Sequence, residues 1–205
     1  PVGAEAGTEF LNAAAVLQTE HHPAELLKTL HEIEALFHRV RTLHWGPRTL
    51  DLDLILHGES EASSPRLVVP HPAMWYRRFV LEPAVEVAPQ MVHPILNESV
   101  AQLYARLMCR PLRLEICSTH HNEESGLLYE VLSHVRDFGD AIELSPADPE
   151  SSIATNSFAR IIVRQGTKPK TLQPFNRKGR EIEVVGESVP DIVSQLEDLR
   201  MAMLG

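Results

Sequence analysis

The stretch Gly46-Pro47-Arg48-Thr49-Leu50-Asp51-Leu52-Asp53 leads directly into the apolar run Leu54-Ile55-Leu56. In an extended chain Asp51 and Asp53 point to the same face, with Cα atoms roughly 6.5–7 Å apart. Two carboxylates this close repel each other unless a cation lies between them. Mg²⁺ fits this place, because it uses few protein carboxylates and takes its other ligands from water and substrate phosphates. Arg48 adds a charge suited to phosphate oxygens, so the stretch predicts a strand that serves phosphoryl-type transfer.

Alternating Asp and Leu residues are also the ordinary pattern of a half-exposed strand with a solvated acidic face. Two further blocks favour the functional interpretation. One begins with Val69-Pro70-His71-Pro72-Ala73-Met74 and continues with Arg77, Phe79, residues 80–83 and residues 88–89; the other is Phe10-Leu11-Asn12-Ala13-Ala14. Together with Trp45 to Asp53, these blocks closely resemble the 6-hydroxymethyl-7,8-dihydropterin pyrophosphokinase family of folate biosynthesis. The resemblance covers about residues 1–108 of the chain.

The resemblance implies an α+β fold, a ferredoxin-like pyrophosphokinase domain over residues 1–110. Family members usually carry a further strand, helix and strand before the part that matches. Pro1-Val2-Gly3 corresponds to the end of the loop after that second strand. The resemblance therefore predicts a domain that lacks its first strand-helix-strand.

The resemblance also implies a reaction and a set of residues. The hydroxymethyl oxygen of the pterin attacks the β-phosphorus of ATP, and AMP leaves. Asp51 and Asp53 would hold two Mg²⁺ ions that bridge the ATP phosphates. The remaining implied residues are catalytic Arg39, Arg41, Trp45 and Arg48, ATP-binding Glu34, Arg66, His71 and Arg77, and pterin-binding Phe10, Asn12 and Phe79. The sequence departs from the common family pattern at Phe10, His31 and His44, where Tyr, Gln and Arg are frequent.

Each of these residue types also has an ordinary structural interpretation. An arginine-rich loop is commonly a solvated surface, a histidine after a proline is commonly structural, and Phe10 and Phe79 suit a plain apolar core. A second hypothesis for the whole chain follows. It is a catalytically inactive binding or regulatory protein on the same scaffold, whose C-terminal part mediates association.

Composition bounds the class of protein. The 205 residues, 43% of them hydrophobic, suit one or two globular domains. A net charge of -9 gives no support to a nucleic-acid binder or an anionic-membrane binder. No apolar run approaches the roughly 18–20 residues of a membrane span. Cys109 and Cys117 lack metal-binding spacing, which indicates reduced thiols and a cytoplasmic protein.

Periodicity predicts the elements of the N-terminal part. Pro23 is suited to the first turn of a helix, and Leu26, Leu30 and Ile33 continue it at helical spacing. At residues 10–17 the resemblance favours a strand over the helix that Ala13-Ala14-Ala15 suggest by propensity. The remaining expectations are the metal-binding strand at 49–56, an extended piece at 65–70, a helix within 72–87 and a helix at 97–108.

A boundary is expected near Arg110-Pro111, followed by a small α+β unit of unknown role over residues 111–205. Its predicted strands are 112–117, 142–144, 159–163 and 181–185, and its predicted helices are 124–138 and a helix from Ser188 to about residue 203. We expect a ferredoxin-like sandwich. The unit has a basic stretch, which we interpret as a solvated hairpin and not as a nucleic-acid site: Arg160, Arg164, Lys168, Lys170, Arg177, Lys178 and Arg180. A dimerisation or packing role is expected for this unit, with self-association as one form of it.

Overall fold

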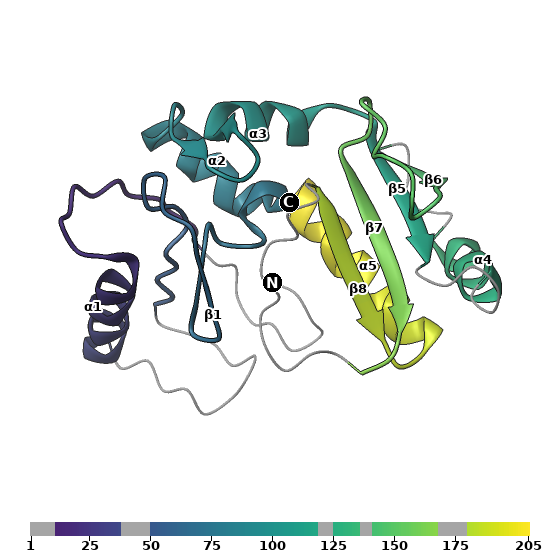
Figure 1. The fold of residues 1–205 in the computed structure, drawn as a ribbon, viewed down its shortest axis with the longest axis horizontal. Helices are drawn as coiled ribbons and strands as arrows, with labels where there is room; N and C mark the ends of the chain where they lie inside the picture. The colour runs from purple at the N-terminus through teal and green to yellow at the C-terminus, as the bar shows by residue number, and fades with distance from the viewer. Residues whose placement is uncertain (1–10, 38–49, 119–124, 136–140, 168–179) are drawn as a thin grey trace.

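The computed structural model describes residues 11–37, 50–118, 125–135, 141–167 and 180–205, a mixed α/β arrangement (Figure 1). The N-terminal part is built from short elements, and its helices carry most of its buried side chains. These elements are α1 (Pro23–Leu36), β1 (Ala62–Ser64), β2 (Leu67–Val69), the 3-10 helix η1 (Met74–Tyr76), α2 (Arg78–Val87), β3 (Val92–His93), β4 (Glu98–Ser99) and α3 (Val100–Met108). Among the described residues, no helix combines the length and apolar character needed to cross a bilayer.

The C-terminal part is a four-stranded parallel sheet with the strand order β6-β5-β7-β8. Its elements are β5 (Leu112–Ser118), α4 (Ser125–His134), β6 (Ile142–Pro146), β7 (Ala159–Gln165), β8 (Glu181–Gly186) and α5 (Val189–Leu204). The sequence patterns locate these strands and helices closely. Ser188 is the N-cap of α5, where its hydroxyl accepts a hydrogen bond from the backbone N–H of Asp191 at 3.4 Å.

The expected ferredoxin-like sandwich is wrong for this unit, because that fold carries an antiparallel sheet. The expected hairpin between residues 160 and 180 is also wrong, because β7 and β8 run parallel. Strand patterns specify which residues are extended but not the direction of their neighbours. The long connections in this part allow the crossovers that parallel pairing requires.

One face of the sheet is apolar and the other is polar. The apolar face packs with α4 and α5 in the hydrophobic core and includes Leu114, Ile116, Ile161 and Val184. Gly186 is the last residue of β8 and lies close to α5. A Cβ at this position would lie only 2.8 Å from Cγ1 of Ile192. Side chains of alternate residues form the polar face as Arg–Glu pairs between neighbouring strands: Arg113 with Glu143, Arg160 with Glu115, and Arg164 with Glu183.

The same hydrophobic core continues across Arg110-Pro111 into the N-terminal part. Trp75 and Leu103 belong to one buried cluster with Ile161 and Met203. The Trp75 ring lies 5.5 Å from the Phe158 ring, measured between centroids. Helices α2 and α3 therefore pack on the C-terminal unit, and α2 lies beside the end of α5 (Figure 1).

Two predicted strands are absent from the part of the chain that the structure describes. Residues 11–17 and 50–56 have no regular secondary structure, and Leu11 and Leu17 are exposed. A strand is held by a hydrogen-bonded neighbour, and no described strand pairs with either segment. Phe10 and Thr49 lie outside the described residues. The alternation of exposure still holds at residues 51–54, where both Asp side chains are exposed and both Leu side chains are half-buried.

A buried histidine makes the stability of the N-terminal part depend on pH. His93 is fully buried, and burial lowers its pKa from 6.5 to about 4, while the nearby Glu98 acts in the opposite direction. The folded state therefore binds the proton less readily than the unfolded state. The contribution of His93 to the free energy of unfolding is fully present above about pH 6.5. As the pH falls toward 4, the free energy of unfolding decreases by about 3 kcal/mol because of this group alone.

Urea unfolding at pH 7.5 and pH 4.5 measures this dependence. In the His93→Asn variant, Oδ1 can replace the imidazole Nδ1 that accepts from the backbone N–H of Leu96 at 3.2 Å. This variant should lose less stability on acidification than the wild type. The same loss in both proteins would show that His93 does not cause it.

Candidate active site

The segment that follows β2 brings one predicted phosphate ligand close to the acidic residues. The backbone N–H of His71 donates to the carbonyl of Ile55 at 2.9 Å, which fixes this segment beside residues 51–55. Burial lowers the pKa of the His71 imidazole, and Arg77 lowers it further, whereas Asp53 raises it. His71 is therefore neutral near pH 7. Its Nδ1 accepts from the backbone N–H of Ala73 at 3.2 Å, so the ring proton is assigned to Nε2.

Arg77 and Phe79 lie at the start of α2. The guanidinium carbon of Arg77 is 5.7 Å from the centroid of the Phe79 ring, a cation–π arrangement. Phe79 remains 37% exposed, so much of its ring surface is open to a ligand. Together with His71 and Asp53, these residues combine a carboxylate, a neutral imidazole, a guanidinium and an aromatic ring.

Glu34 supports the acidic segment from α1. Its side chain is 1% exposed, and its Oε1 accepts a hydrogen bond from the backbone N–H of Leu52 at 2.8 Å. This bond holds the residue between Asp51 and Asp53. The structure thus places Glu34 behind the acidic pair, while its contact with ATP stays a prediction.

Two further predicted site residues, Asn12 and Arg66, lie among the described residues. Asn12 is exposed in a segment without regular structure, and Arg66 is exposed in the turn between β1 and β2. Within the described ranges, no hydrogen bond or ion pair joins either residue to Asp53, His71 or Arg77. The remaining predicted residues lie outside the described residues: Phe10, Arg39, Arg41, Trp45 and Arg48, together with His44.

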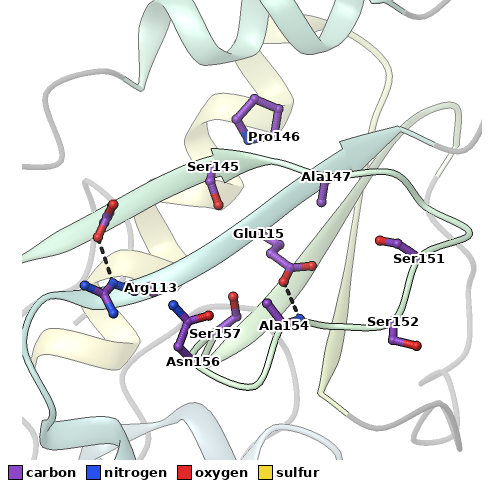
Figure 2. A pocket seen from close by; sticks show the side chains of 11 residues that line it. Arg113, Glu115, Ser145, Pro146, Ala147, Ser151, Ser152, Ala154, Asn156 and Ser157 are labelled. Carbon is purple, nitrogen blue, oxygen red and sulfur yellow. Dashed lines mark hydrogen bonds and ion pairs between the residues drawn. The ribbon is translucent and has the colours of Figure 1, made fainter.

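A cavity of about 490 Å³ lies elsewhere, on the polar face of the C-terminal sheet (Figure 2). Figure 2 shows Glu115 on β5 facing the loop that carries Ser151 to Ser157, with a hydrogen bond from the backbone N–H of Ala154 at 2.7 Å. Of the predicted site residues that the structure describes, none lines this cavity. It is therefore separate from the acidic cluster.

The described arginines of the basic stretch are held in ion pairs. Arg160 is 1% exposed and pairs with Glu115, Arg164 pairs with Glu183, and Arg180 pairs with Glu98. The other four basic residues lie outside the described residues. Each of these three arginines is therefore paired with a carboxylate, while the side chain of Arg164 remains 42% exposed.

Sequence reasoning missed the residues close to His71 and Arg77 that pack or bind against the rest of the chain. Met74 and Trp75 are buried, and Arg78 contacts the far end of the chain. The only signal in the sequence was the apolar Met-Trp-Tyr run directly before Arg77 and Arg78. Nothing in the local pattern could indicate what that run packs against.

The N-terminal part is similar to a family of known proteins. Residues 1–89 match the family model of 7,8-dihydro-6-hydroxymethylpterin-pyrophosphokinase, HPPK. The chain is 45% identical over 101 residues to the 2-amino-4-hydroxy-6-hydroxymethyldihydropteridine pyrophosphokinase of Synechocystis sp., covering 49% of this chain and 52% of the relative. The enzyme of the same name from Pseudomonas aeruginosa is 47% identical over 94 residues, 46% of this chain and 58% of the relative. For the Bacillus subtilis enzyme the identity is 43% over 91 residues, 44% of this chain and 54% of the relative.

The chain therefore spans little more than half the length of these three relatives. The family match includes the Asp51 to Asp53 segment, His71, Arg77 and Phe79, and it ends before α3. By these matches, residues 1–89 of this chain are similar to the 7,8-dihydro-6-hydroxymethylpterin-pyrophosphokinase family.

Proposed function

We propose that the protein transfers a pyrophosphoryl group from ATP to the hydroxymethyl group of 6-hydroxymethyl-7,8-dihydropterin and releases AMP. The observation that carries this proposal is the cluster of Asp53, neutral His71 and Arg77 inside the family-matched segment. The inactive-scaffold alternative is less well supported, because the acidic pair and the phosphate-binding candidates are all retained. A ferredoxin-like fold of the first domain, a cytoplasmic location and self-association belong to the same proposal.

The acidic pair fits Mg²⁺. Asp51 and Asp53 are both exposed, and no described group of three or more His, Cys, Asp or Glu side chains forms a closed cage around them. Two open carboxylates suit a hard ion that takes its remaining ligands from phosphates and water. When bound, two Mg²⁺ ions would neutralise phosphate charge and orient the attacking and leaving oxygens.

The other residues would position the substrates. Nε2–H of His71 would donate a hydrogen bond to an ATP phosphate oxygen, and the Arg77 guanidinium would supply a fixed positive charge. Phe79 would stack on the flat pterin ring. Such a reaction depends on position and charge and requires no covalent nucleophile. Asn12 as the pterin reader, Glu34 and Arg66 as nucleotide contacts, and the loop with Arg39, Arg41, Trp45 and Arg48 complete the proposed site.

The nucleotide product tests the proposal. The whole protein is incubated with ATP, Mg²⁺ and the dihydropterin. It should produce AMP, and not ADP, and the amount of AMP should equal the amount of pyrophosphorylated pterin. Omission of the pterin is the control for background ATP hydrolysis. An absence of pterin-dependent AMP would refute the proposed function and favour the inactive scaffold.

A further inference from the structure

The segment from His71 to Phe79 presents two sets of side chains. His71, Arg77 and Phe79 belong to the proposed site. Met74 and Trp75 are at most 1% exposed and pack in the core that the N-terminal part shares with the C-terminal unit. The segment that would bind substrates is therefore supported from behind by residues outside the family match.

Arg78 makes this support specific. Its Nη1 donates to the backbone carbonyl of Leu204 at 2.6 Å, and its Nη2 donates to Oε1 of Glu82 at 3.2 Å. Leu204 is the last residue of α5, and Arg78 is the first residue of α2. The last carbonyls of a helix lack intrahelical partners and carry partial negative charge, so a guanidinium is a suitable cap. One side chain thus joins the ends of two helices 126 positions apart.

The fit around this contact is close. A Cβ on Gly205 would lie 3.1 Å from both Cδ and Nη1 of Arg78. A second tie joins the same two parts of the chain, because Glu98 beside α3 pairs with both Arg180 and Arg106. Helices α2 and α3 are therefore held against the C-terminal unit by charge as well as by apolar packing.

We infer that Arg78 is a positioning residue for the proposed active site and that the end of α5 is its anchor. Arg77 and Phe79 are its immediate neighbours in the chain, so a shift of Arg78 moves both the guanidinium and the ring. The inference rests on the proposed function and assigns a role to residues 111–205 in that function. The C-terminal unit fixes the first turn of α2 in the orientation that substrates require.

Kinetics of the whole protein test this role. Arg78→Met removes the donors but keeps most of the side-chain length, and it should lower kcat/KM for ATP by about 10–100-fold, the scale of a misplacement of roughly 1 Å. Arg78→Lys retains one donor for the Leu204 carbonyl and should restore most of the activity. Arg113→Met is the matched control, because Arg113 is paired with Glu143 on the sheet, far from α2 in the chain, and should leave kcat/KM unchanged.

Two readouts separate positioning from simple loss of stability. Activities are compared per folded molecule, at a temperature where urea titration shows each variant to be folded. Once Arg77 is replaced by Met, the added Arg78→Met substitution should change kcat/KM for ATP much less than it does alone. Wild-type kinetics per folded molecule in Arg78→Met, or fully additive losses in the double variant, would overturn the inference.

Hydrogen exchange distinguishes failure of this inference from failure of the proposed function. Arg78→Met should speed amide exchange at residues 78–82 relative to wild type and to Arg113→Met. If the wild type makes no AMP, the proposed function fails, and the catalytic role of Arg78 fails with it. If the wild type makes AMP but exchange in α2 is unchanged in Arg78→Met, only the positioning role is refuted.

Discussion

Asp53→Asn should lower the rate of AMP formation by at least about 10²–10³-fold, the range found when a key electrostatic group is removed from an active site. Asn has nearly the same shape as Asp but no charge, so it binds Mg²⁺ poorly. The side chain is exposed, so the substitution leaves no buried group without a partner. The effect should therefore appear in turnover and not in stability. Initial rates of AMP release at several Mg²⁺ concentrations measure it.

A second measurement on the same variant does not depend on bound metal. Asp53 raises the pKa of His71, against the lowering effects of burial and of Arg77. The pKa of His71 should therefore fall further in Asp53→Asn, which a titration of the imidazole by NMR can follow. An unchanged His71 pKa would argue against the proximity of the two groups.

Glu61→Gln is the matched control for the loss of one negative charge, because Glu61 is also exposed in the N-terminal part and is assigned no role in the site. It should keep the wild-type rate. Asp51→Asn should behave like Asp53→Asn. Retention of activity within a few-fold in both Asp variants would contradict the assignment of the metal ligands.

Glu115→Gln should destabilise the protein by about 3–5 kcal/mol, because it leaves a buried guanidinium without its counter-charge. Glu115 is 5% exposed and Arg160 is 1% exposed. Oε2 of Glu115 accepts from Nε of Arg160 at 2.9 Å and from Nη2 at 2.6 Å. Arg160 also donates to the carbonyl of Ser151 at 2.7 Å, so the pair holds the loop after β6 against the sheet.

Equilibrium unfolding in urea at pH 7 measures this loss. Arg113→Met is the control, since the side chains of Arg113 and Glu143 are 48% and 57% exposed and such pairs contribute about 0–1 kcal/mol. The double variant Glu115→Met/Arg160→Met should recover part of the stability, because no unpaired charge remains buried. Equal losses in Glu115→Gln and Arg113→Met would show that burial does not strengthen the Glu115–Arg160 pair.

The pH dependence of this pair has a definite sign. Burial alone would raise the pKa of Glu115, but hydrogen bonds from Ala154, Arg160 and Ser157 and the charge of Arg160 lower it overall. The stabilisation is therefore present above the ordinary carboxyl pKa of 4.5 and is lost as the pH falls below it.

The sequence predicts elements whose signals are local. Pro23 begins α1, and Ser188 caps α5, because a fixed proline φ and a side-chain acceptor act within one turn. The strand positions of the C-terminal sheet follow from short apolar runs. Their parallel order does not, because pairing joins strands such as β5 and β7, whose Leu114 and Ala159 are 45 positions apart.

In the proposed site, too, some features could be predicted from the sequence and others depend on tertiary contacts. The resemblance to a known family indicates His71 and Arg77, and alternation indicates that Asp51 and Asp53 share an exposed side. The support of that site could not be predicted, since the hydrogen bond of Glu34 to Leu52 and that of Arg78 to Leu204 depend on tertiary packing. The expected strands around Asn12 and Asp53 likewise depended on neighbours that a local pattern does not reveal.

The burial of Trp75 has a practical consequence for spectroscopy. The chain contains two tryptophans, Trp45 and Trp75, so a Trp45→Phe variant would carry a single indole. That indole is 1% exposed and lies against Phe158 at the junction of α2 with the C-terminal unit. Its fluorescence would shift to longer wavelength when water reaches the junction. The molecule thus contains an intrinsic optical reporter one position from Tyr76 and two from Arg77, which can follow separation of the two parts without an added label.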